Sequence, residues 1–143
     1  MPPKRILVVD DDNAILRLLL ALFSRENYEV DTAAGGKDAL AKIARTPYDV
    51  IVLDLMMPEV GGLEVLRSLE ARIPHVKCVV ILSAASSFDV ATSINSNVFA
   101  ALRKPFDNTV LITAVRDCIE SKCGAAGPAL PIHVVEAVAP KAA

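Results

Sequence analysis

The sequence predicts an α/β domain in which a doubly wound parallel sheet carries helices on both faces. One observation is the continuous apolar, mostly β-branched run Val50–Leu53, which ends in Asp54 and is typical of a strand buried on both faces. A second is the regular alternation of strand-like and helical patterns along the chain, which favours βαβ units. With 143 residues, 53% of them hydrophobic, the chain is long enough for one domain with its own core.

Two strand–helix units are expected at the start of the chain. Arg5–Asp10 is an apolar run ending in acid, and a helical pattern follows over Ala14–Arg25, with Asp12 as a natural N-terminal cap. Tyr28–Ala33 alternates apolar and charged side chains, which fits a strand at the edge of the sheet. A glycine turn then leads into an expected helix over Lys37–Arg45.

The second half of the chain continues the alternation after the central strand. The remaining elements are expected as a helix over Leu63–Arg72, a strand over Val76–Leu82, a helix over Phe88–Asn95, a strand over Val98–Leu102 and a helix from about Asn108 to Ser121. Right-handed crossovers between five parallel strands favour the flavodoxin-like strand order 2-1-3-4-5.

The last twenty residues differ in composition from the rest. Residues 124–143 are rich in Gly, Ala and Pro, so we divide the chain into a domain over 1–123 and a tail or linker over 124–143. Within this tail, Ile132–Val138 is apolar enough to dock against the domain.

Charge and composition exclude several classes of function. The net charge is −2 and Lys and Arg form no cluster, which argues against direct nucleic-acid binding. The apolar stretch Ala14–Phe23 is too short to cross a membrane, and the chain's start leads directly into a strand, without a signal peptide. We expect the three cysteines to be buried or idle thiols rather than a disulfide framework, and the chain to be cytoplasmic.

Polar residues follow four of the five predicted strands. These residues are Asp10 and Asp11, Asp54, Ser83, and Lys104. The four strands are neighbours in the expected order, and ligands gather at the carboxyl ends of parallel strands. Three carboxylates repel one another unless a cation neutralises them, and all-oxygen ligation suits Mg²⁺ or Mn²⁺. With a lysine and a hydroxyl, the group could hold a phosphoryl group transferred to a carboxylate nucleophile.

These residues stand in four motifs that are familiar as a set. The motifs are Ile6–Asp11, Leu53–Pro58, Leu82–Ala84 and Lys104–Phe106. In this order and spacing the chain resembles the receiver domain of two-component response regulators, with a fold like that of chemotaxis regulators, over about residues 4–121. The resemblance implies a signalling switch that catalyses only its own phosphorylation and dephosphorylation.

The resemblance also implies a role for each acidic residue. Asp54 is expected to be the phosphoacceptor and a metal ligand. Asp11 is expected to bind Mg²⁺ directly, Asp10 mainly through bound water, and Met56 through its backbone carbonyl. Without the resemblance, Asp12 could serve as a third ligand, but capping is the preferred role.

Two further residues are implied to act on the phosphoryl group. Lys104 is expected to pair with its oxygens, with a cis bond to Pro105, and Ser83 to donate a hydrogen bond to it. The resemblance implies a sensor histidine kinase or histidine phosphotransfer protein as donor. The helix over Phe88–Asn95, the strand over Val98–Leu102 and the last helix would form the partner surface, which could also serve a homodimer.

The sequence departs from the family pattern at positions that are expected to affect how the domain signals to its partner. Where the family usually carries a switching Tyr or Phe, this chain has Ala101; Phe99, two residues earlier, is expected on the same strand face and is a candidate replacement. Met56 and Ala85 flank the expected phosphoryl site, and neither side chain can position an attacking water, so we expect slow loss of the phosphoryl group.

Three other functions compete with a receiver domain. A phosphatase or phosphotransferase with an aspartate nucleophile usually has an acid two residues later, where this chain has Met56. A flavin-binding domain would need a phosphate-cradling loop after the first strand, where three aspartates stand. A receiver-like interaction module that takes no phosphate remains the alternative, because Ala101 replaces the switch residue. The kinase, pathway and output are not encoded in a recognisable motif.

Overall fold

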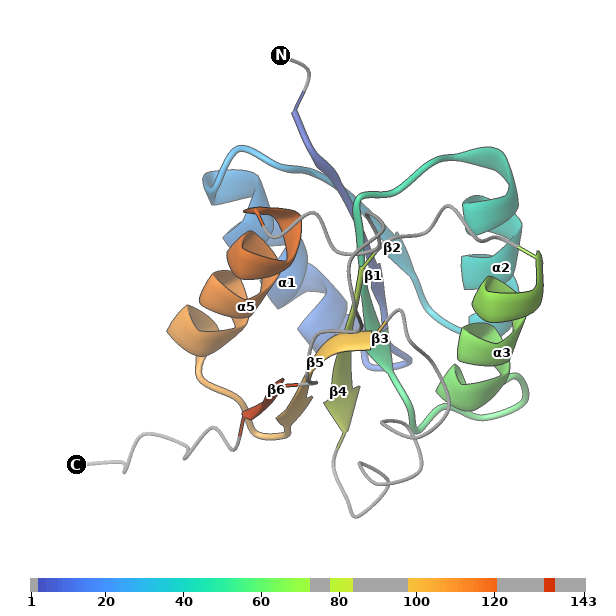
Figure 1. Cartoon of the computed structure of the whole chain (residues 1–143). Helices are drawn as coiled ribbons and strands as arrows, with labels where there is room; N and C mark the ends of the chain where they lie inside the picture. Colours follow the sequence, from blue (N-terminus) through green and yellow to red (C-terminus); the bar gives the residue numbers. More distant parts are fainter. Residues whose placement is uncertain (1–2, 73–77, 84–97, 121–132, 136–143) are drawn as a thin grey trace.

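The computed structural model describes residues 3–72, 78–83, 98–120 and 133–135, and these contain the expected alternation of strands and helices (Figure 1). In chain order the elements are β1 (Arg5–Val9), α1 (Asn13–Arg25), β2 (Glu29–Ala33), α2 (Gly36–Arg45), β3 (Val50–Asp54), α3 (Gly62–Arg72), β4 (Val79–Ser83), β5 (Val98–Arg103), α5 (Asn108–Glu120) and β6 (His133–Val135). The expected helix over Phe88–Asn95 lies outside the described residues.

The strands form one parallel sheet in the order β2-β1-β3-β4-β5-β6. The predicted order of the first five strands is therefore confirmed, and β2 lies at an edge as its alternating pattern indicated. The sixth strand pairs with β5 from Ala100 opposite His133 to Leu102 opposite Val135. Part of the apolar segment in the tail thus docks on the sheet, while the domain boundary at residue 123 stays a prediction.

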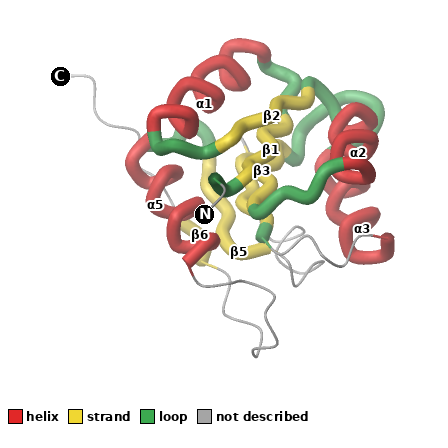
Figure 2. The backbone as a smooth tube through the Cα atoms, turned by 90° about the horizontal axis from the view of Figure 1, so that it is seen from above, coloured by secondary structure: helices red, strands yellow, loops and turns green. Residues whose placement is uncertain are grey.

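Two helical layers cover the sheet. Helices α1 and α5 lie on one face, and α2 and α3 lie on the other (Figures 1 and 2). Strand residues alternate between the two cores: Ile6 and Val8 of β1 pack on the α1/α5 side, and Leu7 and Val9 on the α2/α3 side. Each fully buried Leu or Ile contributes about 1.5–3 kcal/mol, so these two layers hold the strand ends in place.

Helix α1 shows how sequence signals set an element. Asp12 has extended backbone geometry and accepts a hydrogen bond from the backbone N–H of Ala14 at 2.9 Å, which confirms its expected capping role. Leu16, Leu19 and Phe23 form the buried face of the helix. No described helix combines the length and apolar character needed to span a bilayer.

A β-bulge in β5 changes the direction of one predicted switch residue. Val79 of β4 pairs with Val98, but the next residue, Val80, pairs with Ala100, so Phe99 is the extra residue on β5. Phe99 consequently packs with the α1/α5 core, whereas Ala101 is fully buried in the α2/α3 core. The prediction that both side chains share a face is wrong, because it assumed an uninterrupted two-residue alternation.

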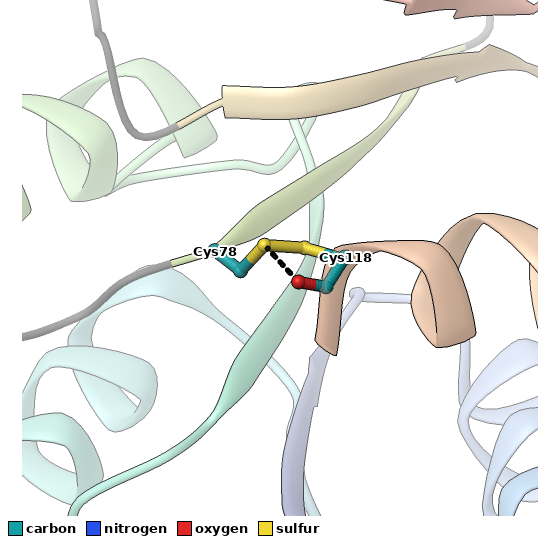
Figure 3. Close-up of a disulfide and its surroundings, with 2 residues drawn as sticks. All are labelled: Cys78 and Cys118. Carbon is teal, nitrogen blue, oxygen red and sulfur yellow. Dashed lines mark hydrogen bonds between the residues drawn. A yellow bond between two sulfur atoms is a disulfide. The ribbon is translucent and has the colours of Figure 1, made fainter. Parts of the chain in front are cut away.

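The cysteines also differ from expectation. A disulfide joins Cys78, just before β4, to Cys118 in the last turn of α5, and Figure 3 shows the two side chains meeting in the core. Both residues are 1% exposed, so burial was predicted correctly, but the expectation of unpaired thiols is wrong for this pair. Their Cα atoms lie 6.2 Å apart, inside the range of about 4.4–6.8 Å that a disulfide can bridge. Cys123 lies outside the described residues.

Candidate functional site

Two carboxylates lie at the carboxyl edge of the sheet because neighbouring strands end there. Strands β1 and β3 pair in parallel up to Val9 opposite Leu53, so the next residues, Asp10 and Asp54, emerge side by side. Asp10 is 0% and Asp54 is 2% exposed, and they are the two buried charged residues among those described. Buried carboxylates are rare unless they are paired with a positive charge or hydrogen-bond donors. The groups that pair with Asp10 and Asp54 therefore define the site.

Asp11 adds a third carboxylate to this pair. One oxygen from each of Asp10, Asp11 and Asp54 can be chosen so that all three lie within 4.8 Å of one another. Asp11 is exposed, whereas the other two are buried, so the cluster opens to solvent on the side of Asp11. Oxygen ligands grouped in this way are the set that Mg²⁺ prefers.

Lys104 provides the positive charge opposite the acids. It follows the last residue of β5, and its Nζ lies 2.8 Å from Oδ2 of Asp10 and 3.4 Å from Oδ2 of Asp54. The lysine side chain is 18% exposed, so the contact with Asp10 is a largely desolvated ion pair. The peptide bond from Lys104 to Pro105 is cis, as the resemblance implied.

Backbone N–H groups fix the orientation of both buried carboxylates. The N–H of Asp12 donates to Oδ1 of Asp10 at 2.9 Å, and the N–H of Met56 donates to Oδ1 of Asp54 at 3.0 Å. In each carboxylate the second oxygen, Oδ2, faces Lys104. The loops after β1 and β3 therefore hold the two acids in matching orientations.

The buried, charged surroundings of two site residues, Asp54 and Lys104, raise the pKa of both. The pKa of Asp54 is raised, chiefly because burial disfavours the carboxylate and because Asp10 lies nearby, although the Met56 N–H and Lys104 oppose this. Burial alone would lower the pKa of Lys104, but its hydrogen bond to Asp10 and the charges of both acids raise it overall. The lysine is thus held firmly as a cation.

The loop after Asp54 depends on a glycine at the start of α3. A Cβ on Gly62 would collide with the carbonyl oxygen of Asp54 and with Cα of Leu55, so the helix approaches β3 closely only with glycine there. Of the two methionines in this loop, Met56 has an exposed side chain and Met57 packs against the α2/α3 core. A soft thioether is in any case a poor ligand for a metal site made of hard oxygen ligands.

The structure brings together Asp10, Asp11, Asp54 and Lys104, four of the residues singled out from sequence. Ser83 ends β4 opposite Arg103, at the same edge of the sheet, but its side chain lies outside the described residues, as does all of Ala85. The sequence did not indicate that Lys104 lies closest to Asp10 or that Gly62 supports Asp54. Both relations depend on distances between elements, which motif spacing does not give.

Comparison with known proteins agrees with this geometry. A family model described as response regulator receiver domain matches residues 6–116. Response regulator PleD of Caulobacter vibrioides is 40% identical over 120 residues, covering 82% of this chain and 26% of PleD. Response regulator ArlR of Staphylococcus aureus is 32% identical over 112 residues, covering 78% of this chain and 51% of ArlR. The chain thus spans between about a quarter and a half of the length of these relatives.

Solved structures show the same similarity. A CheY-like receiver domain protein from Methanospirillum hungatei has a TM-score of 0.75 at 28% identity, covering 84% of this chain and 96% of its own. TrrA from Thermotoga maritima, solved in complex with Mg(2+)-BeF, has a TM-score of 0.70 at 34% identity, covering 80% and 98%. From the matched family model, the relatives and the acidic site at the sheet edge, we conclude that the chain belongs to the response regulator receiver domain family.

Proposed function

We propose that the chain is the phosphoacceptor of a two-component or phosphorelay pathway, and that Asp54 receives the phosphoryl group from a phosphohistidine. The observation that carries this proposal is the setting of Asp54. Its carboxylate is buried, one oxygen is held by the Met56 N–H, and the other lies 3.4 Å from the ammonium of Lys104. A nucleophile held beside a fixed cation is what phosphoryl transfer requires, because positioning and charge stabilisation supply most of the catalysis.

The described residues fit a divalent cation. Asp10, Asp11 and Asp54 carry three negative charges against the single ammonium of Lys104, so the cluster favours a further positive charge. These three carboxylates, together with the backbone carbonyl of Met56, would hold Mg²⁺, or Mn²⁺ in its place. A bound Mg²⁺ neutralises charge on the phosphoryl oxygens.

The transfer then follows from the orientation of Asp54. Its Oδ2 is the nucleophile, because Oδ1 already accepts the Met56 N–H. As the new O–P bond forms, the P–N bond to the donor histidine breaks and its electron pair returns to the imidazole. Lys104 moves from Asp10 toward the phosphoryl oxygens, and the hydroxyl of Ser83 donates to the same group from the end of β4.

The partners of this reaction are a sensor histidine kinase or a histidine phosphotransfer protein in the cytoplasm. The phosphorylated chain acts through β5 and α5, by contacting a downstream protein or a second copy; the helix expected over residues 88–95 of the same surface lies outside the described residues. It turns over no outside substrate, since Met56 stands where an aspartate-nucleophile phosphatase has its acid. A receiver-like module that takes no phosphate is not favoured, because the acids and Lys104 are gathered in one site.

The proposed switch can be tested by amide hydrogen exchange on the whole chain. Treatment with acetyl phosphate and Mg²⁺ should change amide exchange in β5, which leads up to Lys104, and in α5, which follows it. The same treatment of an Asp54→Asn variant should leave exchange as it was. An identical change in both proteins would contradict the proposal, because the response would then not depend on Asp54.

A further inference from the structure

The two buried cysteines lie at the end of the sheet opposite the acidic site. Cys78 precedes the first residue of β4, whereas Asp54 is the last residue of β3, and Asp10, Asp11 and Lys104 follow the last residues of their strands. Helix α5 runs back along the sheet, so Cys118 in its last turn reaches the start of β4 (Figure 3). The cysteine pair is therefore separate from the phosphoryl site and has no part in its chemistry.

The disulfide closes a long loop of the chain. The two cysteines are 40 positions apart in the sequence, and the loop includes β4, β5, Lys104 and most of α5. The three acids lie outside it, in the first half of the chain. A bond between Cys78 and Cys118 therefore restrains the half of the domain that carries Lys104 and the proposed output surface.

The same geometry also serves the reduced pair. Sγ of Cys78 lies 3.4 Å from the carbonyl oxygen of Cys118, so a thiol there can donate a weak hydrogen bond. Cys118 lies in the last turn of α5, so its carbonyl group is close to the end of the helix. A reduced Cys78 would therefore have a hydrogen-bond acceptor beside it in the core.

We propose that Cys78 and Cys118 are a redox-modifiable pair that small-molecule disulfides, such as oxidised glutathione, close and thiols reopen. Disulfides in the cytoplasm are usually transient or redox-sensing rather than permanent, so the proposed location of the chain favours a reversible pair. Both positions lie at the end of an element, where local opening exposes the sulfur atoms most readily. The inference does not depend on phosphorylation of Asp54.

The proposed reaction is a thiol–disulfide exchange in two steps. The thiolate of one cysteine attacks a sulfur of oxidised glutathione, which forms a mixed disulfide and releases one glutathione thiolate. The thiolate of the second cysteine then displaces the other glutathione and forms the Cys78–Cys118 bond. Two protein thiols are oxidised and one glutathione disulfide is reduced to two glutathione thiols, which take up, through solvent, the two protons that the protein thiols release. Because buried thiols react slowly, closure should need minutes to hours.

The test uses the whole chain in three forms: the parent, Cys123→Ser and Cys78→Ser. Cys123→Ser removes the third thiol, and Cys78→Ser keeps a hydroxyl donor for the Cys118 carbonyl but cannot form the bond. Each protein is reduced, treated with oxidised glutathione and compared by intact mass, peptide mapping and melting temperature. We expect Cys123→Ser to lose two hydrogen atoms in mass, to yield a linked peptide pair containing Cys78 and Cys118, and to return to its starting mass with dithiothreitol.

The melting temperature shows whether the disulfide restrains the domain or forms without affecting its stability. Closing a loop of this length should raise the melting temperature of Cys123→Ser by about 10 °C on oxidation, while Cys78→Ser should show no rise. Amide exchange should slow in β4, β5 and α5 and stay unchanged in β1. The proposal is overturned if the two thiols of Cys123→Ser remain alkylatable after oxidation. It is also overturned if glutathione stays attached without an internal bond, or if the bond forms and the melting temperature does not rise.

Discussion

Lys104 binds Asp10 more closely than it binds Asp54: the Nζ to Oδ2 distances are 2.8 Å and 3.4 Å. The lysine thus neutralises the acid next to the proposed phosphoacceptor while leaving an oxygen of Asp54 within reach. A phosphoryl group on Asp54 would offer the ammonium new oxygen partners. The contact between Lys104 and Asp10 is therefore the one most directly exposed to a change at Asp54.

Removing the lysine should destabilise the domain strongly in the absence of metal. Lys104→Ala leaves the buried carboxylates of Asp10 and Asp54 without their cation, and breaking a buried pair in this way costs about 3–5 kcal/mol. Urea unfolding with a chelator present measures the loss. Addition of Mg²⁺ should recover part of it, because the ion supplies the missing positive charge.

A surface ion pair provides the control for this prediction. Arg116 binds Glu26 at 3.1 Å, with side chains that are 50% and 34% exposed, and Arg116→Ala should cost less than about 1 kcal/mol. A Lys104→Ala variant no less stable than Arg116→Ala would show that the buried acids do not depend on Lys104.

Neutralising the proposed phosphoacceptor should stabilise the metal-free domain. The pKa of Asp54 is raised, mainly by burial, so folding favours its protonated form and its charge opposes folding at neutral pH. Asp54→Asn removes that charge and keeps an acceptor for the Met56 N–H. Its melting temperature at pH 7 should exceed that of the parent by a few degrees, the shift for about 1 kcal/mol in a domain of this size.

The pH dependence of this gain has a defined sign. Below the unfolded-state pKa of about 4, Asp54 is protonated in both the folded and the unfolded parent, so the charge contributes no difference between the two proteins. The advantage of Asp54→Asn should appear as pH rises through the raised pKa of the folded parent. A gain that is the same at pH 3.5 and pH 7, or a loss at pH 7, would contradict the account.

Tyr48 offers a test at alkaline pH that is remote from the acidic site. Its hydroxyl donates to Oδ2 of Asp31 at 2.6 Å, and burial together with this bond raises its pKa to about 12. The neutral phenol therefore stabilises the fold fully below its unfolded pKa of about 10, and this contribution is lost as pH rises toward 12.

Comparison with Tyr48→Phe isolates the hydroxyl from other groups that titrate at high pH. At pH 8 the parent should be more stable than Tyr48→Phe by about 1–2 kcal/mol, from the lost hydrogen bond. Urea unfolding at pH 8, 10 and 11 should show this difference shrinking as pH rises. If the stability difference between the two proteins stayed constant with pH, the Tyr48 hydroxyl would have the same pKa in the folded and the unfolded chain.

The side chain of Met56 should govern the lifetime of a phosphoryl group on Asp54. It is 56% exposed beside the site, and a thioether cannot orient a water for attack on phosphorus. Met56→Asn provides an amide that can, so the phosphorylated variant should lose its phosphoryl group several-fold faster than the parent. The half-life of each phosphorylated protein after removal of the donor measures this, and equal half-lives would refute it.

The sequence was informative wherever a local pattern carried the signal. The apolar runs ending at Asp10 and Asp54 identified two buried strands, and their parallel order placed both acids at one edge. The position of Lys104 after β5 was predicted in the same way. Its preference for Asp10 over Asp54 was not, because it depends on tenths of an ångström in the folded domain.

Other features had no local signal. The bulge at Phe99 adds one residue to β5 with no glycine or proline to mark it, so the expected alternation assigned Phe99 to the wrong face. Cys78 and Cys118 are forty residues apart and meet only because α5 returns to the start of β4. The β6 strand is three residues long and relies on pairing with β5, so an apolar pattern indicated docking but not its position.

The most direct test of the central claim is the intact mass of the whole chain after incubation with acetyl phosphate. With Mg²⁺ present, the parent should gain one phosphoryl group, and the gain should be absent with a chelator and in Asp54→Asn. A gain of equal size in Asp54→Asn, or no gain by the parent from either acetyl phosphate or a phosphorylated histidine donor, would contradict the assignment of Asp54 as the phosphoacceptor.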